Sequence, residues 1–335
     1  MPALLQEGYL PVGNGHSVYF SEHGNPLGPA SVVLHGGPGS GCNISMLDWF
    51  DLSRQRVILL DQRGAGKSLP AGGLTHNTSA DLVSDLERLR HMLQIARWSV
   101  VGGSWGSTLG IVYAGSFPQA VSSLIMRGVF LASQREMHWF FQSLAALVPQ
   151  AWQQLTSGWT SQQKSNVLQS LTALLQNGTP AEMQDAAQRW NDYEAAIMQA
   201  MTGLAPAHLP ETPPSPPSAS PASGRGEQSE SLRDFQVSDA ESLVNKYRLQ
   251  SHYLSQHCFL NAHAVFRHAR AAGKVPVAIV HGTHDWICPP ENVIRLQRFM
   301  PDAAVRWVEK GTHTTSDPAI GMALRAAIRD MLQYS

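Results

Sequence analysis

The stretch Gly102-Gly103-Ser104-Trp105-Gly106 decides the fold because of what stands on either side of it. Residues 98–101 (Trp-Ser-Val-Val) precede it as an apolar run that predicts a strand, and residues 107–117 have the composition of a helix. Between a strand and a helix, a G-x-S-x-G motif forms a sharp turn that exposes the serine hydroxyl above the sheet. The motif alone is common, so its meaning depends on whether the chain holds the rest of a catalytic site.

Composition narrows the class of protein. The chain has 335 residues, is 43% hydrophobic and carries a formal net charge of -1. It can therefore bury a sizeable core, and nothing in its charge indicates a nucleic acid or an anionic membrane as partner. Three cysteines, Cys42, Cys258 and Cys288, are too few and too widely spaced for a disulfide framework or a cysteine-rich zinc site.

Targeting signals are also missing from the sequence. Residues 1–15 lack the pattern of a secretory signal, and no apolar run approaches the roughly 18 residues that span a bilayer. We therefore expect a cytoplasmic protein that binds no membrane. We also expect that it needs no cofactor. The sequence does not determine its oligomeric state.

The two ends of the chain alternate predicted strands with predicted helices. Residues 32–34 and 57–60 are short apolar runs typical of covered strands, and leucines recur at helical spacing between 78 and 95. Residues 275–280 and 305–308 are further predicted strands near the C-terminus. This order predicts an α/β fold with a mainly parallel sheet flanked by helices.

A helical insertion interrupts the α/β pattern. From residue 131 to about 200, and again from 238 to about 271, the sequence is helix-like and holds no clear strand. Residues 206–221 contain seven prolines, which is typical of a solvated loop. The insertion would cover the carboxyl edge of the sheet, where ligands bind in open α/β sheets. The predicted division is a core over 1–130 and 266–335, and a cap over 131–265 with a disordered Pro/Ser-rich loop at about 205–232.

A serine nucleophile needs a base, and the base needs an acid that orients it. In the chain order of the α/β-hydrolase fold, the acid follows the serine and the histidine comes last. Asp285 comes shortly after a late predicted strand and is the expected acid, whereas Asp302 and Asp317 follow no core strand so closely. His313 lies on the loop after the last predicted strand and is the expected base.

Acyl transfer also needs N–H donors aimed at the developing oxyanion. The first expected donor is the backbone N–H of Trp105, the residue after the serine. The second is Gly37, in the glycine-rich stretch His35-Gly36-Gly37-Pro38-Gly39 that follows an early predicted strand. Glycines there allow backbone N–H groups to approach a substrate closely.

Two other kinds of site are disfavoured. His281 and His284 stand close to Asp285, but no other clustered ligands accompany them, so we expect no metal site. Gly66-Lys67-Ser68 ends like a nucleotide-binding P-loop, yet Asp61 occupies the position of that motif's first glycine. We expect residues 61–68 to form a structural loop that supports the active site.

Six motifs from both parts of the predicted core form a specific set. They are His35-Gly36-Gly37-Pro38-Gly39, Asp61-Gln62-Arg63-Gly64, Gly102-Gly103-Ser104-Trp105-Gly106-Ser107, Arg127-Gly128-Val129-Phe130, Val280-His281-Gly282 with Asp285, and Gly311-Thr312-His313. Together they closely resemble the prolyl aminopeptidases (proline iminopeptidases), serine peptidases of the α/β-hydrolase fold. The resemblance implies release of an N-terminal residue, usually proline, from a small peptide with a free N-terminus. It also implies Ser104 as nucleophile, Asp285 as orienting acid and His313 as base.

The predicted cap resembles the family less closely. Family members hold the free amino end of the substrate with carboxylates from the cap. Trp190-Asn191-Asp192-Tyr193-Glu194 looks like the motif that supplies one of them, which implies a substrate-binding role for Glu194 with Trp190 and Tyr193 beside it. Phe130 matches the aromatic residue that packs on the proline ring. Gln250 stands where a second glutamate is expected, and losing that charge-assisted bond weakens recognition of an ammonium by roughly 1.5–3 kcal/mol.

Alternative activities follow from the same residues. Gln250 motivates an esterase, amidase or lactonase with a neutral acyl pocket on the same scaffold. A non-catalytic binding protein is disfavoured because no member of the expected triad is missing. Epoxide hydrolases and dehalogenases of this fold are disfavoured because they resemble one another in using aspartate at the position of Ser104.

Overall fold

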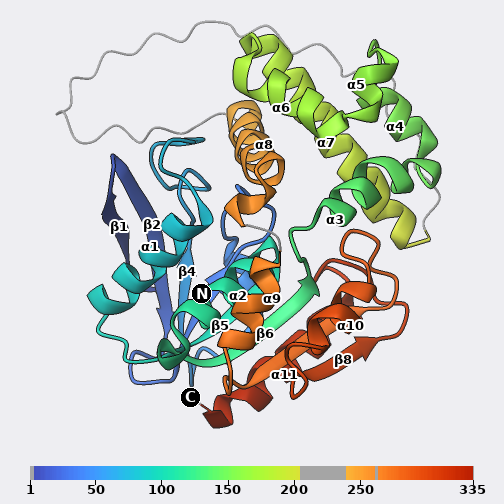
Figure 1. The fold of residues 1–335 in the computed structure, drawn as a ribbon. Helices are drawn as coiled ribbons and strands as arrows, with labels where there is room; N and C mark the ends of the chain where they lie inside the picture. Colours follow the sequence, from blue (N-terminus) through green and yellow to red (C-terminus); the bar gives the residue numbers. More distant parts are fainter. Residues whose placement is uncertain (1–3, 204–238, 261–262, 335) are drawn as a thin grey trace, which may run out of the picture.

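The computed structural model describes residues 4–203, 239–260 and 263–334 (Figure 1). Within these residues, eight strands form one sheet in the order β1-β2-β4-β3-β5-β6-β7-β8. The pairs β1–β2 and β2–β4 are antiparallel. All other neighbouring pairs in the sheet, from β4–β3 to β7–β8, are parallel. The prediction of a mainly parallel α/β sheet is confirmed. The strands are β1 (Leu4–Gly13), β2 (His16–Gly24), β3 (Ala30–Leu34), β4 (Arg56–Leu60), β5 (Trp98–Ser104), β6 (Val121–Val129), β7 (Val277–Gly282) and β8 (Ala304–Val308).

Helices of very different lengths connect and cover these strands. The α-helices are α1 (Ser79–Met92), α2 (Trp105–Ser116), α3 (Gln134–His138), α4 (Pro149–Leu155), α5 (Ser161–Ser165), α6 (Val167–Asn177), α7 (Pro180–Met201), α8 (Asp239–Ser255), α9 (Ala264–Ala271), α10 (Glu291–Gln297) and α11 (Pro318–Met331). Shorter 3-10 and π segments are η1 (Ile44–Trp49), η2 (Pro118–Ala120), η3 (Trp139–Ser143), η4 (Leu144–Ala146), η5 (His257–Phe259) and η6 (Leu332–Tyr334).

The antiparallel hairpin of β1 and β2 has no counterpart in the sequence-based prediction. Most of β1 is exposed at the edge of the sheet, so its sequence contains no continuous apolar run. Strand β2 pairs with β4 on its other side, yet it mixes polar and apolar residues throughout. Strand prediction from apolar runs therefore missed both elements.

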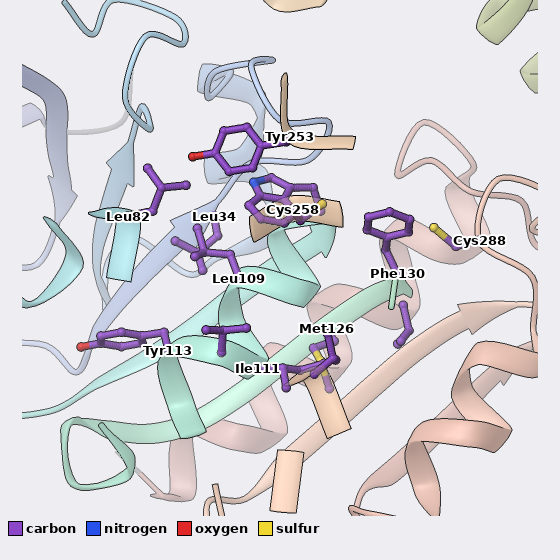
Figure 2. Close-up of a cluster of buried hydrophobic side chains, with 14 of the residues drawn as sticks. Leu34, Leu82, Leu109, Ile111, Tyr113, Met126, Phe130, Tyr253, Cys258 and Cys288 are labelled. Atoms are coloured by element: carbon purple, nitrogen blue, oxygen red, sulfur yellow. The ribbon is translucent and has the colours of Figure 1, made fainter. Parts of the chain in front are cut away.

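Alternating residues of the central strands face two separate apolar clusters. Val32 and Leu34 belong to a large cluster that also contains residues of α1, α2 and α9, whereas Val33 faces a smaller cluster with residues of η1 and α11. Helices therefore cover both faces of the sheet, which is why the strands are apolar on both sides. Figure 2 shows part of the larger cluster, with Leu34 and Leu109 near its centre.

Only helical segments were found between β6 and β7 in the part of the chain that the structure describes. Helices α4 to α8 lie together above the sheet in Figure 1. Helix α9 instead packs on α2, so closely that a Cβ on Gly115 would collide with the backbone of His268. The division into core and cap at residues 131 and 265 stays a prediction. The predicted Pro/Ser-rich loop at 205–232 lies outside the described residues.

Helix α8 packs directly on the glycine-rich loop that follows β3. A Cβ on Gly39 would lie 2.7 Å from the carbonyl oxygen of Lys246 and 2.9 Å from Cβ of Leu249, and Gly39 has φ +107°. Further along the helix, the Tyr253 hydroxyl donates a hydrogen bond of 2.7 Å to Oδ1 of Asn77. Glycine at position 39 is therefore required for the close approach of α8 to the core.

The loop at 61–68 is a structural support, as its sequence predicts. Arg63 makes two buried hydrogen bonds to the Asp85 carboxylate, of 2.6 and 2.7 Å, which tie the loop to helix α1. Asp61 accepts hydrogen bonds from the backbone N–H groups of Cys42 and Lys67, at 2.6 and 2.8 Å. These bonds hold the loop against the segment that follows β3.

The buried ion pair gives a first testable prediction. Asp85→Ala would remove the buried partner of the Arg63 guanidinium and leave it with the Asp81 carboxylate, 3.7 Å away. We expect a loss of about 3 kcal/mol in the free energy of unfolding, the lower end of the cost of breaking a buried pair. The matched control is Asp330→Ala, which breaks an exposed pair with Arg306 and should change the free energy of unfolding far less. Urea-induced unfolding measures both, and equal losses in the two variants would contradict the prediction.

Candidate active site

Ser104 sits in a strained turn between β5 and α2. Its φ of 55° and ψ of -121° lie in a region that non-glycine residues rarely adopt, at a cost of order 1–3 kcal/mol. The glycines make the turn possible, because a Cβ on Gly102 would collide with the Gly106 carbonyl. The Ser107 hydroxyl donates a hydrogen bond of 2.6 Å to the Ser104 carbonyl. Surrounding contacts thus hold the expected nucleophile in its turn at the end of β5.

Asp285 and His313, expected as acid and base, lie together. Nδ1 of His313 is 2.9 and 2.8 Å from the two carboxylate oxygens of Asp285. Only 1% of Asp285 and 8% of His313 is exposed. Burial raises the pKa of Asp285, but His313 and the hydrogen bonds outweigh burial, and the net pKa lies below the ordinary value. With Nδ1–H donating to the carboxylate, Nε2 of His313 is the ring nitrogen left for the role of base, and that role stays a prediction.

The Ser104 hydroxyl lies at the same site but does not bond to His313. Oγ of Ser104 lies 4.0 Å from Sγ of Cys288. The structure describes both Ser104 and His313, and no hydrogen bond joins their side chains. In unliganded hydrolases such bonds are often long and tighten only when substrate binds. Cys288 was missed by sequence reasoning, although it stands three residues after the expected acid.

Gly128 and Arg127, at the end of β6, pack against the Asp285–His313 pair. Gly128 has φ +56°, and a Cβ there would lie 3.0 Å from Cε1 of His313 and 3.1 Å from Oδ2 of Asp285. The Arg127 guanidinium donates a hydrogen bond to the backbone carbonyl of His313. The sequence motif contained both residues, but only the fold shows what they contact.

The glycine-rich loop after β3 lies beside Ser104. A Cβ on Gly36 would be 3.3 Å from Cβ of Ser104, and 3.1 Å from the Gly103 carbonyl. Gly37, the expected second oxyanion donor, follows with φ +40°. Its donor role stays a prediction.

Side chains fix this loop relative to the serine turn. Nε1 of Trp105 donates a hydrogen bond of 2.8 Å to Oε1 of Gln62. Gln62 in turn bonds to His35 through two contacts, from its backbone N–H to Nε2 at 3.1 Å and from its side chain to the His35 carbonyl at 3.2 Å. The backbone of Trp105 is thereby held in place, and its oxyanion role also stays a prediction.

The two cap positions singled out in the sequence meet over the glycine-rich loop. Nε2 of Gln250 donates a hydrogen bond of 2.6 Å to Oε1 of Glu194. Tyr247 donates one of 2.8 Å to Oε2 of the same carboxylate, and Nζ of Lys246 lies 3.6 Å from that oxygen. Oε1 of Gln250 would be 3.4 Å from a Cβ on Gly37. Sequence reasoning missed Tyr247 and Lys246, although they lie one helical turn before Gln250, on the spacing that brings helix neighbours together.

The aromatic residues predicted near the substrate lie in the interior. Trp190 and Tyr193 are fully buried in the region of α7 and α8. The centres of the Trp190 and Tyr247 rings are 5.1 Å apart. The Tyr193 hydroxyl donates a hydrogen bond of 2.8 Å to the Phe140 carbonyl. Both rings support the helix that carries Glu194, and direct contact with substrate stays a prediction.

Phe130 lies just past the end of β6. It is 8% exposed, and its backbone N–H donates a hydrogen bond of 3.1 Å to Oγ of Ser107. Figure 2 shows Phe130 and Cys288 at one edge of the apolar cluster. Phe130 is therefore tied to the first turn of α2, directly after the serine, and its packing on a substrate ring stays a prediction.

His281, one of the histidines weighed as a metal ligand, has a structural role. Its Nε2 lies 2.9 Å from the Cys288 carbonyl, and its Nδ1 accepts a hydrogen bond of 3.2 Å from the Val129 backbone. Burial lowers the pKa of His281, which favours the neutral ring. Both ring nitrogens are occupied by backbone groups, so this side chain offers no free position to a metal.

The chain is similar over nearly its whole length to known α/β hydrolases. A family model described as "alpha/beta hydrolase fold" matches residues 29–317. The proline iminopeptidase of Xylella fastidiosa (strain 9a5c) is 33% identical over 318 residues, covering 94% of this chain and 92% of the relative. That of Neisseria gonorrhoeae is 30% identical over 331 residues, covering 98% and 96%. The solved structure of VinJ, 20% identical with a TM-score of 0.64 and 99% of both chains covered, shares the fold.

The packing behind the Asp285–His313 pair is directly testable. Gly128→Ala would press a methyl group against both side chains, and we expect turnover of an activated ester to fall by up to about 100-fold, the size of effect that a small misplacement of catalytic groups produces. Gly8→Ala in β1 is the matched control, because a Cβ there meets nothing within 4 Å. Equal turnover in the two variants, at equal folded fraction by circular dichroism, would refute the prediction.

Proposed function

This chain belongs to the proline iminopeptidase family of α/β-hydrolase-fold proteins, and we propose that it is a serine aminopeptidase that releases N-terminal proline, or another small residue, from peptides. One observation carries the choice of an aminopeptidase. Gln250 contacts the Glu194 carboxylate on one side and approaches Gly37, beside the serine turn, on the other. A carboxylate connected through Gln250 to the loop beside the serine turn suits the amino end of a peptide, and simple ester hydrolysis has no need of one.

The proposed mechanism uses the expected triad. His313 takes the proton of the Ser104 hydroxyl through Nε2 while the oxygen attacks the first peptide carbonyl, and Asp285 stabilises the imidazolium that forms. The backbone N–H groups of Trp105 and Gly37 stabilise the oxyanion. The same histidine then protonates the leaving amine, which departs and leaves an acyl-enzyme. Water hydrolyses that ester with His313 again acting as base, and no cofactor takes part.

The proposed substrate is a small peptide with a free N-terminus. Its α-amino group would lie near Glu194 and Gln250, and a proline ring would pack on Phe130, the residue tied to the first turn of α2. The fully buried Trp190 and Tyr193 would act by holding Glu194 in position. The close approach of Gln250 to Gly37 would limit the acyl group to a single small residue.

A second candidate function is an esterase, amidase or lactonase with a neutral acyl pocket. Gln250 favours it, because an amide replaces one of the two carboxylates that hold an ammonium in the family. This candidate predicts efficient hydrolysis of acyl esters with no benefit from a free α-amino group. Efficient turnover of a simple acyl ester together with no turnover of proline p-nitroanilide would therefore indicate this second function.

We also propose that the protein acts in the cytoplasm. Its three cysteines are unpaired, as expected in a reducing compartment. Within the described residues, no helix combines the length and apolar character needed to cross a lipid bilayer.

The nucleophile is tested by Ser104→Ala. We expect wild-type protein to hydrolyse proline p-nitroanilide and the variant to lose about 10⁶-fold in kcat, since a triad without its nucleophile retains only background catalysis. Ser84→Ala, on the exposed side of α1, is the matched control and should retain full activity. A fluorophosphonate probe should label the wild type and the control but not Ser104→Ala. Wild-type protein that turns over no aminoacyl anilide would refute the aminopeptidase.

The site proposed for the substrate α-amino group consists of Glu194 and Gln250 and is called the amino-end site below. It is tested by Gln250→Glu. The variant puts a second carboxylate in place of the amide whose Nε2 lies 2.6 Å from Glu194, and a substrate ammonium between the two carboxylates would relieve their repulsion. We expect kcat/KM for proline p-nitroanilide to rise about tenfold, with no gain for a simple acyl ester. Gln256→Glu, exposed just beyond α8, is the matched control. An equal gain for both substrates would argue that Gln250 does not face the amino group.

A further inference from the structure

The Glu194 carboxylate is already satisfied by the protein itself. Oε1 accepts a hydrogen bond from Gln250, and Oε2 accepts one from the Tyr247 hydroxyl and lies 3.6 Å from the Lys246 ammonium. The Lys246 and Glu194 side chains are only 28% and 24% exposed, so solvent screens their attraction incompletely. The unit charge that the amino-end site would offer to a substrate is therefore already matched by a unit charge of opposite sign.

The acceptor that remains open at this site is a neutral one. A carboxylate can only accept, so the side-chain amide of Gln250 must direct Nε2 toward Glu194 and Oε1 away from it. Gln250 is 7% exposed, and its Oε1 is a buried atom without a hydrogen-bond partner in the structure. A buried unpaired carbonyl oxygen is unfavourable unless a ligand supplies the donor. That oxygen would lie 3.4 Å from a Cβ on Gly37, so it faces the glycine-rich loop that is expected to supply an oxyanion donor.

Lys246 is held where it neutralises Glu194. Its Nζ lies 3.2 Å from the Tyr247 hydroxyl and 4.5 Å from the centre of the Tyr247 ring. Its backbone packs on Gly39 of the glycine-rich loop, which fixes this turn of α8. Burial and the nearby Glu194 raise the pKa of Tyr247, so this hydroxyl stays a neutral donor and Lys246 supplies the positive charge.

We propose that Lys246 is a built-in counter-ion of the amino-end site and determines which acyl groups the enzyme accepts. With Glu194 neutralised, the α-nitrogen of a substrate meets the neutral carbonyl oxygen of Gln250 and, close by, a like-charged ammonium. The enzyme therefore discriminates little between an acyl group that carries an α-ammonium and an uncharged acyl group of the same shape. The inference rests on the proposed function and deepens it, because it extends the substrate class to small cyclic acyl groups without an amine.

The test compares two p-nitroanilides that differ only in the ring nitrogen, those of proline and of cyclopentanecarboxylic acid. The measured quantity is the ratio of their kcat/KM values at low ionic strength. Lys246→Met removes the positive charge beside Glu194, so the carboxylate can pair with a substrate ammonium. We expect the ratio of kcat/KM for proline to kcat/KM for the cyclopentane substrate to rise about tenfold, the effect of one charge-assisted hydrogen bond. Lys246→Arg keeps the positive charge and should retain the wild-type ratio. Lys274→Met, an exposed lysine in the turn before β7, is the matched control and should also leave the ratio unchanged.

The outcomes separate this proposal from the proposed function. An unchanged or lower ratio in Lys246→Met overturns the counter-ion, even when the wild type cleaves proline p-nitroanilide well. Cleavage of only the cyclopentanecarbonyl substrate by the wild type refutes the aminopeptidase, whereas a gain of proline cleavage in Lys246→Met would still support the counter-ion. Lys246→Gln repeats the measurement should the methionine variant fail to fold.

Discussion

The hydrogen bond between Asp285 and His313 is the interaction around which the candidate site is packed. The pair is almost fully buried, and the backbone of β6 passes close to it, so a side chain at position 128, where φ is left-handed, would press against both residues. Arg127 then holds the His313 backbone, and its guanidinium occupies the space where a side chain at Gly103 would stand. Gly128, Arg127 and Gly103 are thus linked by packing to one buried pair.

Helix α8 imposes a second constraint, because it joins the helical segment to the core at the expected site. It reaches the glycine-rich loop through Gly39, and the same helix carries Lys246, Tyr247 and Gln250. A shift of this helix would move the residues that contact Glu194 and the residues that pack on the glycine-rich loop together. The chemistry of the site and the packing of the helix are therefore coupled.

Much of the fold and part of the site could be predicted from local sequence. The covered strands are continuous apolar runs, and the turn at Ser104 is defined by adjacent glycines, so both can be identified within a few residues. The β1–β2 hairpin escaped prediction because an exposed edge strand needs no apolar run. The position of Asp285 and His313 was predicted from chain order, and the structure brings their side chains together.

The sequence by itself determined the covered strands and the serine turn, because each depends on residues close together in the chain. It also determined the candidates for acid and base, because the order of strands and catalytic residues along the chain is characteristic of this fold. Only the tertiary structure decided what surrounds them. Tyr247 and Glu194 are 53 residues apart, and their meeting depends on how α7 packs against α8. The charge on Lys246 acts on Glu194 for the same reason, since an electrostatic interaction depends on distance in space and not on distance along the chain.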